Sequence, residues 1–83
     1  MHYTYIIVCS DGYYYTGYTN NVEKRIKKHN NNKGAKYTRG RTPVKLKYQE
    51  SYNSKSKAMQ REYEIKQMTR TQKQELIDSH KNQ

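Results

Sequence analysis

The strongest constraint on this chain is a pair of strand-like runs near its N-terminus, separated by an Asp-Gly turn signal. Residues 2–10 are rich in β-branched and aromatic side chains and apolar on both alternating faces, which is typical of a central strand. Residues 13–19 form a second run of this kind, so the two runs predict a β-hairpin. A chain of 83 residues builds one modest core, and this hairpin is its natural centre.

The length of the hairpin loop decides which tyrosines share a face of the sheet. A two-residue loop at 11–12 places Tyr5 and Tyr15 on opposite faces. A three-residue loop at 10–12, with its glycine in the left-handed conformation, places Tyr5 opposite Gly17 and on the same face as Tyr15. A site that uses both tyrosines requires the three-residue loop. The alternative is that both are ordinary strand tyrosines without a functional role.

Downstream of the hairpin, the pattern predicts a helix over residues 22–30. Thr19 or Asn20 is the expected N-cap, and Glu23 is the expected capping-box partner of Asn20. A run of asparagines ending in glycine then stops the helix, and a basic loop over residues 33–42 follows.

A third strand and a second helix are expected next. Pro43 marks the entry to a strand over about residues 44–50. Ser54 or Ser56 then caps a helix that continues to about residue 68.

The chain is expected to end in a short third helix, which starts at Thr69 or Thr71 and runs to about residue 79. The order β-β-α-β-α-α predicts an α+β fold, in which a small three-stranded, mostly antiparallel sheet has flanking helices. We expect residues 1–80 to form one domain and residues 81–83 to be a polar C-terminal tail.

The charge of the chain is strongly positive and unevenly distributed. The formal net charge is +10, and residues 24–49 include ten Lys or Arg and no acid. A basic face of this kind attracts polyphosphate through counterion release. A solubilising surface is the simpler interpretation, and a membrane-surface role is disfavoured because no basic segment has a broad apolar face.

The chain has one cysteine, Cys9, so it cannot form an intramolecular disulfide, and a reducing compartment fits. We find no hydrophobic run of membrane-spanning length and no signal-peptide pattern. The sequence therefore predicts a cytoplasmic protein with no membrane partner.

Two side chains of the first predicted helix suggest a phosphate site. Arg25 and His29 are four residues apart, so they project side by side and flank the inward-facing Val22 and Ile26. A guanidinium beside an imidazole can hold a phosphate and carry a proton. On spacing alone, an arginine that snorkels and a histidine at the edge of the core explain the pattern better than a phosphate site does.

Glu62 is unusual because it falls between Ala58 and Ile65, within the apolar stripe of the second predicted helix. A carboxylate that points toward a core requires a cation, a metal ion or a proton. A salt bridge to a Lys or Arg is the simplest solution in so basic a chain. Magnesium is the other, because it combines few carboxylates with phosphate oxygens.

Taken in order, these residues resemble the GIY-YIG nuclease superfamily, and the resemblance covers nearly the whole chain. It is closest to small single-domain bacterial members and is similar to the nuclease domain of Slx-type endonucleases. The segment of residues 34–44 is characteristic of that subgroup. Tyr3-Thr4 replaces Gly-Ile of the first motif, and Thr16 replaces Ile of the second. The motif residues are the tyrosines and glycine of 3–7 and 15–19, Arg25, His29 and Glu62.

The resemblance implies catalytic roles for Tyr5 and Tyr15, the two motif tyrosines, and for Arg25, which matches the arginine that contacts the scissile phosphate. It implies that His29 lies near the nucleophilic water and that Glu62 is the metal ligand. A second, substrate-binding group follows from the characteristic basic segment: Lys36, Tyr37, Arg39 and Arg41.

The resemblance also implies metal-dependent hydrolysis of phosphodiester bonds in DNA, with one Mg²⁺ or Mn²⁺ at Glu62. Arg25 would offset charge on the non-bridging oxygens. Tyr5 and His29 are both candidates for the general base, and we expect Arg25 and the metal to lower the pKa of Tyr5.

The expected partner is nucleic acid, with DNA favoured over RNA. Contacts to the backbone do not read bases, so little sequence specificity is expected, with a preference for branched or single-stranded structure. A protein partner that supplies specificity is compatible with the small size of the chain. The competing hypothesis is a nucleic-acid-binding module that has this fold and little or no turnover.

Overall fold

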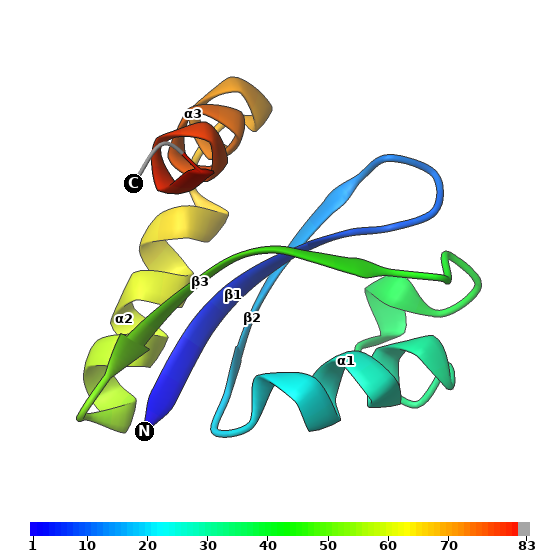
Figure 1. Cartoon of the computed structure of the whole chain (residues 1–83), viewed down its shortest axis with the longest axis horizontal. Coiled ribbons are helices and arrows are strands. Elements are labelled where there is room, and N and C mark those ends of the chain that lie inside the picture. The colour runs from blue at the N-terminus through cyan, green and yellow to red at the C-terminus, as the bar shows by residue number, and fades with distance from the viewer. Residues whose placement is uncertain (82–83) are drawn as a thin grey trace.

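The computed structural model describes residues 1–81 and confirms the α+β fold in the predicted order, with one added turn of 3₁₀ helix (Figure 1). Of the expected tail at 81–83, the first residue closes the last helix and the other two lie outside the described residues. The elements are β1 (His2–Val8), β2 (Tyr14–Thr19), α1 (Val22–Asn30), η1 (Lys36–Thr38), β3 (Lys45–Tyr52), α2 (Lys55–Lys66) and α3 (Arg70–Lys81).

The three strands form one antiparallel sheet in the order β2-β1-β3, so β1 is the central strand, as its apolar pattern predicts. The pairing of β1 with β3 shifts between Ile6 and Ile7, where Ile6 faces Tyr48 and Ile7 faces Leu46. Lys47 is therefore an extra residue on the edge strand, and the resulting bulge increases the local bend of β3.

The hairpin adopts the three-residue loop. Ile7 pairs with Tyr15 and Tyr5 pairs with Gly17, which is the register that the longer loop predicts. Gly12 has φ of +88°, and its amide donates to the Cys9 carbonyl over 2.9 Å. Tyr5 and Tyr15 consequently point from the same face of the sheet, which confirms the register on which a joint site depends.

The predicted cap of α1 is wrong. The N-cap is Asn21, whose side chain accepts from the Lys24 amide over 3.0 Å. Thr19 instead uses its hydroxyl to accept from the Asn21 amide over 3.1 Å, which stabilises the turn before the helix. Because Asn21 starts the helix one residue later than Asn20 would, Glu23 occupies N2 and the expected capping box does not form.

The other two caps follow the sequence. Ser54 accepts from the Lys57 amide at the start of α2, at 3.4 Å. At α3, the Gln72 amide donates to the Thr69 hydroxyl over 3.2 Å and the Thr69 amide donates to the Gln72 side chain over 2.9 Å, which is a reciprocal capping box.

Helices cover both faces of the sheet: α1 lies on one side, and α2 and α3 lie on the other (Figure 1). The face that carries Tyr5 and Ile7 packs with Cys9 and Val44, and Ile26 of α1 rests against them. The opposite face of the sheet also carries a cluster of buried, mostly apolar side chains. Its buried residues are Ile6, Tyr48, Ile65 and Ile77. None of the helices within residues 1–81 is long and apolar enough to cross a membrane.

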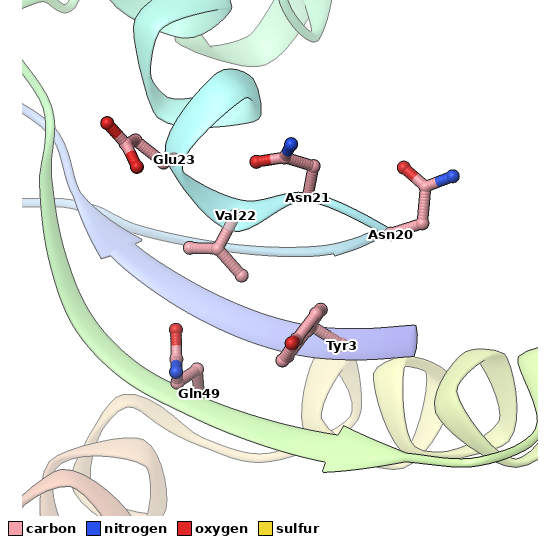
Figure 2. A pocket seen from close by; sticks show the side chains of 6 residues that line it. All are labelled: Tyr3, Asn20, Asn21, Val22, Glu23 and Gln49. Carbon is pink, nitrogen blue, oxygen red and sulfur yellow. The ribbon is translucent and has the colours of Figure 1, made fainter. Parts of the chain in front are cut away.

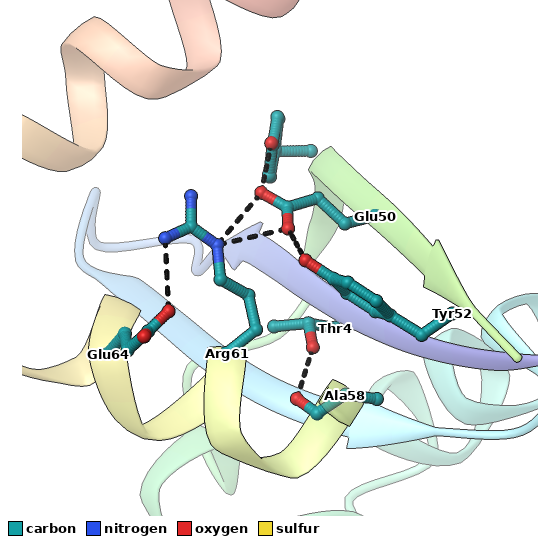
Figure 3. A network of polar contacts seen from close by, with 7 residues as sticks. Thr4, Glu50, Tyr52, Ala58, Arg61 and Glu64 are labelled. Atoms are coloured by element: carbon teal, nitrogen blue, oxygen red, sulfur yellow. Dashed lines mark hydrogen bonds and ion pairs between the residues drawn. The ribbon is translucent and has the colours of Figure 1, made fainter. Parts of the chain in front are cut away.

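A closed polar network ties β3 to α2 (Figure 3). The Arg61 Nε donates to Glu50 over 3.0 Å, and the hydroxyls of Tyr48 and Tyr52 donate to the same carboxylate. Burial alone would raise the pKa of Glu50, but the hydrogen bonds from Arg61 and the two tyrosines outweigh burial and lower it. Below this network, the Thr4 hydroxyl donates to the Ala58 carbonyl over 2.6 Å (Figure 3).

Candidate active site

The centre of the candidate site is a buried chain of hydrogen bonds through Tyr5, His29 and Thr38. The Tyr5 hydroxyl lies 2.9 Å from His29 Nε2, and the Thr38 hydroxyl lies 2.8 Å from His29 Nδ1. Thr38 donates its own proton to the Ala35 carbonyl over 2.9 Å, so its oxygen must accept from Nδ1. The neutral imidazole then carries its proton on Nδ1 and accepts the Tyr5 proton at Nε2.

The pKa shifts fit this assignment of protons. Burial, followed by the positive charges of Arg25 and Lys28, lowers the pKa of His29 from its ordinary value of 6.5, so the imidazole is neutral near pH 7. The pKa of Tyr5 is raised above its ordinary value of 10.0, chiefly by burial. Arg25 does lower this pKa, as expected, but burial and Tyr15 outweigh it. The free protein therefore holds Tyr5 as a phenol, which corrects the expectation of an easily ionised tyrosine.

Gly17 makes room for the Tyr5 ring. A Cβ at this position would collide with the Tyr5 hydroxyl, so the second-motif glycine is required for the ring to lie across β2. Tyr15, two residues earlier on the same face, meets the His29 ring edge-on, with centroids 5.6 Å apart. His29 is fully buried and is not at the edge of the core. The two motif tyrosines therefore enclose one buried imidazole.

Arg25 is half-buried and brings positive charge to this cluster, because it lowers the pKa of both Tyr5 and His29. A cavity of about 200 Å³ opens beside it. The lining of this cavity combines hydroxyl and amide groups with three cations, and consists of Thr19, Asn20, Asn21, Lys24, Arg25 and Lys28. Such a cavity suits a phosphate.

The neighbouring cavity at the start of α1 is larger, about 370 Å³, but its lining has no Lys or Arg (Figure 2). Figure 2 shows Glu23 and the amides of Asn20, Asn21 and Gln49 around it, with Tyr3 on β1. An anion should therefore prefer the smaller cavity at Arg25, although the larger one is more open to solvent.

Glu62 lies on α2 with only 17% of its side chain exposed, and its charge contributes to the raised pKa of Tyr5. Its carboxylate is therefore mostly buried, and its charge acts on the Tyr5 phenol from the helix on the other side of the sheet. It forms an ion pair with Lys66 over 3.0 Å, and the Lys66 ammonium is also 5.8 Å from the Tyr15 ring centroid. The salt bridge that the sequence anticipates is thus present, and the metal-binding role of Glu62 stays a prediction.

A metal ion at Glu62 would have one protein carboxylate as its ligand. Within residues 1–81 no group of three or more His, Cys, Asp or Glu side chains could hold a metal ion. Mg²⁺ tolerates this arrangement, because it retains waters and takes the remaining oxygens from a phosphate. Glu62 therefore fits a metal that arrives with its substrate, and Lys66 is the cation that such a metal would replace.

Of the four predicted substrate-binding residues, the structure brings two to the cluster. The Tyr37 ring stacks on Tyr15, with centroids 5.7 Å apart, and the Arg41 guanidinium lies 4.5 Å from the Tyr37 centroid. Lys36 and Arg39 are exposed on the same loop.

Two residues of the cluster were not identified from the sequence. Thr38 is buried and fixes the tautomer of His29, and Lys66 is the counter-ion of Glu62. The signal for Lys66 was available, since it follows Glu62 by four residues on a helix. Thr38 had no local signal, because its partner His29 lies across a loop whose path the sequence does not specify.

Comparison with known proteins gives the class. A family model described as the GIY-YIG catalytic domain matches residues 1–75. The chain is 62% identical over 77 residues to a UPF0213 protein of Halobacterium salinarum, which covers 93% of this chain and all of that protein. It is 61% identical over 79 residues to a UPF0213 protein of Clostridium perfringens, covering 95% and 85% of the two chains.

Two solved structures agree with this match. The NMR structure of a UPF0213 protein from Bacillus halodurans has 52% identity and a TM-score of 0.61, and the match covers 93% of this chain and 82% of that one. The NMR structure of a protein from Enterococcus faecalis, 37% identical, has a TM-score of 0.65 and covers 99% and 88%. The chain therefore belongs to the GIY-YIG catalytic domains. Within that class it is a member of the UPF0213 family.

Proposed function

We propose that this protein is a divalent-metal-dependent endonuclease that hydrolyses phosphodiester bonds in DNA, with branched or otherwise structured DNA as its substrate. The observation that carries the proposal is the buried chain from Tyr5 through His29 to Thr38, whose phenol feels the charges of Arg25 and Glu62. A neutral imidazole that accepts from a phenol, next to a cation and a carboxylate, is an arrangement for moving a proton near a phosphate.

The proton leaves the attacking water through Tyr5. The phenol oxygen takes the proton of the water while its own proton passes to His29 Nε2, over the 2.9 Å that separates the two atoms. Tyr5 then never needs to exist as a free phenolate, which its raised pKa disfavours. His29 is the proton store, and its hydrogen bond to Thr38 keeps Nε2 facing Tyr5. Both of the candidate bases therefore take part in one relay.

Arg25 binds the non-bridging oxygens of the phosphate and offsets the charge that builds up on them. Glu62 would hold the metal ion, which supplies Lewis-acid stabilisation of the leaving oxygen when bound. Tyr15 packs against His29 and lies under the Lys66 ammonium, so its ring forms part of the surface that contacts the phosphate. Lys66 is then free to move toward solvent, since its side chain is 46% exposed.

The basic residues around the site would bind the DNA substrate. The Arg25 cavity and the exposed Lys36 and Arg39 would contact the DNA backbone, while Tyr37 and Arg41 flank the cluster, as the Slx-like resemblance suggests. We place the enzyme in the cytoplasm as a single domain, where a protein partner would add specificity that backbone contacts lack.

One observation favours a second candidate, a binding module without turnover. Glu62 already has a counter-ion in Lys66, so it does not require a metal for charge balance. A chain that uses this pair only for stability would retain the basic face and bind nucleic acid without cutting it.

The test is a cleavage assay on branched and linear DNA with Mg²⁺ or Mn²⁺ and with EDTA. We expect the parent to cut only with metal, and Glu62→Ala and Arg25→Ala each to lower the rate by about a hundredfold or more. Glu64→Ala is the matched control, because Glu64 lies on the same helix with its side chain 52% exposed. Absence of metal-dependent cutting by the parent would leave the binding module; equal cutting by all variants would identify a contaminant.

A further inference from the structure

A group of tyrosine rings around one guanidinium leads from the cluster to the surface. Tyr37 stacks on Tyr15 with an interplanar angle of 25°, and the Arg41 guanidinium follows at 4.5 Å from the Tyr37 centroid. The same guanidinium also lies 5.5 Å from the centroid of the Tyr13 ring. Tyr37 is 43% exposed and Tyr13 is 57% exposed, so both rings present area to solvent. No sequence pattern distinguishes Tyr13 from the other tyrosines.

Arg41 is held in place by an ion pair and by backbone hydrogen bonds. Arg41 pairs with Asp11 over 3.0 Å, which fixes the guanidinium against the rings. Its backbone is bound at both ends, because its amide donates to the Thr38 carbonyl over 3.1 Å and its carbonyl accepts from the Ser10 amide over 2.7 Å. The backbone therefore already joins the hairpin loop to the 3₁₀ turn, and the exposed rings are not needed for that purpose.

We propose that Tyr13, Arg41 and Tyr37 form a stacking subsite for one unpaired nucleobase of the bound strand, beside the phosphate at Arg25. Exposed aromatic rings and a guanidinium plane are the groups that stack on bases, and every base has a face that accepts them. Asp11 neutralises Arg41, so the subsite attracts a neutral base rather than a further phosphate. A base in a duplex is already stacked and cannot reach it.

The subsite rests on the proposed function, in that the base belongs to the strand being cut. It adds a reason for preferring branched DNA, since only a junction or a single strand offers an unpaired base. Thr38 connects the two regions, because it ends the proton relay and its carbonyl holds the backbone of Arg41.

The experiment measures the Kd of a single-stranded oligonucleotide without divalent metal, with 2-aminopurine placed at successive positions. We expect fluorescence quenching at one position, and we expect Tyr13→Ala and Tyr37→Ala each to raise the Kd by about tenfold. Tyr63→Ala is the matched control, since Tyr63 is 68% exposed on α2 and should leave the Kd unchanged. Tyr13→Phe and Tyr37→Phe should bind like the parent, because stacking uses the ring and not the hydroxyl.

Three results would overturn the subsite: equal losses for Tyr63→Ala, failure of the Phe variants to restore binding, or equal losses on a fully paired duplex. The proposed function fails separately. A parent that shows the expected binding pattern but never cuts DNA with metal retains the subsite and loses the nuclease. A parent that cuts DNA but binds single strands independently of Tyr13 and Tyr37 retains the nuclease and loses the subsite.

Discussion

Two polar clusters lie on opposite faces of the same sheet, and they differ in whether they carry charge. The Glu50 cluster, between β3 and α2, joins one carboxylate to Arg61 and two tyrosine hydroxyls. The His29 cluster, between β1, α1 and the 3₁₀ turn, consists of neutral groups connected in a row. The first holds charged groups in ion pairs, with Arg61 shared between Glu50 and Glu64, whereas the second has a proton that can move along it.

The difference also appears in the pKa shifts. In the Glu50 cluster, the shifts favour the charged pair: the pKa of Glu50 is lowered and that of Arg61 is raised, chiefly by their mutual hydrogen bond in the case of Arg61. In the His29 cluster, burial disfavours every charged form, so a proton arriving at His29 is held weakly. The Glu50 cluster, whose charged forms are favoured, thus stabilises the fold. The His29 cluster, in which a proton can move, suits chemistry.

Arg61→Met gives the largest expected change in stability. It leaves Glu50 without its cation, and we expect the free energy of unfolding to fall by about 2 kcal/mol, less than for a fully buried pair because 26% of the Arg61 side chain is exposed. Urea unfolding measures this loss. Cleavage per folded molecule should stay at the parent level; a matching loss of both would mean that the two clusters are one unit.

Thr38→Val should weaken the fold somewhat less, by about 1–2 kcal/mol, because it leaves the buried Nδ1–H of His29 without an acceptor. The same change at Thr16 is the control, since the Thr16 hydroxyl is buried without a hydrogen-bond partner within the described residues. Thr16→Val should therefore be neutral or stabilising. Thermal or urea unfolding of the two variants gives the comparison, and equal destabilisation would contradict the assigned tautomer.

The pH dependence of stability should separate the clusters. The pKa of His29 is lower in the folded chain than in the unfolded chain. Below about pH 6.5 the unfolded chain therefore binds a proton at His29 that the folded chain does not bind. The free energy of unfolding consequently falls as the pH decreases toward the pKa of the folded state. The lowered pKa of Glu50 stabilises the fold above its ordinary value of 4.5, and this contribution is lost as the pH decreases below it.

Urea titrations at a series of pH values test this. His29→Gln should flatten the decline that begins below about pH 6.5, and Arg61→Met should flatten only the decline below about pH 4.5. The account of the two clusters is contradicted if the His29→Gln curve keeps the full slope in the higher window.

Lys66→Met has the smallest expected effect. Without its partly exposed counter-ion, Glu62 should bind a metal ion about threefold more tightly, as the modest energy of an i,i+4 ion pair implies. The chain has no Trp, so luminescence of Tb³⁺ sensitised by the neighbouring tyrosines can report the affinity without any cleavage. Lys57→Met, at an exposed lysine of the same helix, should leave the affinity unchanged. Weaker binding by Lys66→Met would show that Lys66 supports the metal rather than competing with it.

Most of the fold could be predicted from the sequence, because local signals govern it. The apolar run of β1, the Asp-Gly turn and the serine and threonine caps each act over a few residues. The cap of α1 was wrong because three successive polar residues could all serve, and the chosen one depends on how the turn after β2 closes.

The site was predictable only in part. The register that brings Tyr5 and Tyr15 together follows from the loop, but the burial of His29 and its bond to Thr38 depend on the path of residues 31–37. The Glu50 cluster was missed entirely. It joins a strand to a helix through side chains whose spacing has no local periodicity.

The most direct test of the central claim is the single-turnover cleavage rate of His29→Gln, measured beside Arg61→Met at a temperature where both are folded. Gln can accept from Tyr5 and donate to Thr38, but it cannot store a proton. The account predicts a rate about a thousandfold below the parent for His29→Gln and a parent-like rate for Arg61→Met. Parent-like cleavage by His29→Gln would contradict the claim that the His29 cluster takes up the proton of the attacking water.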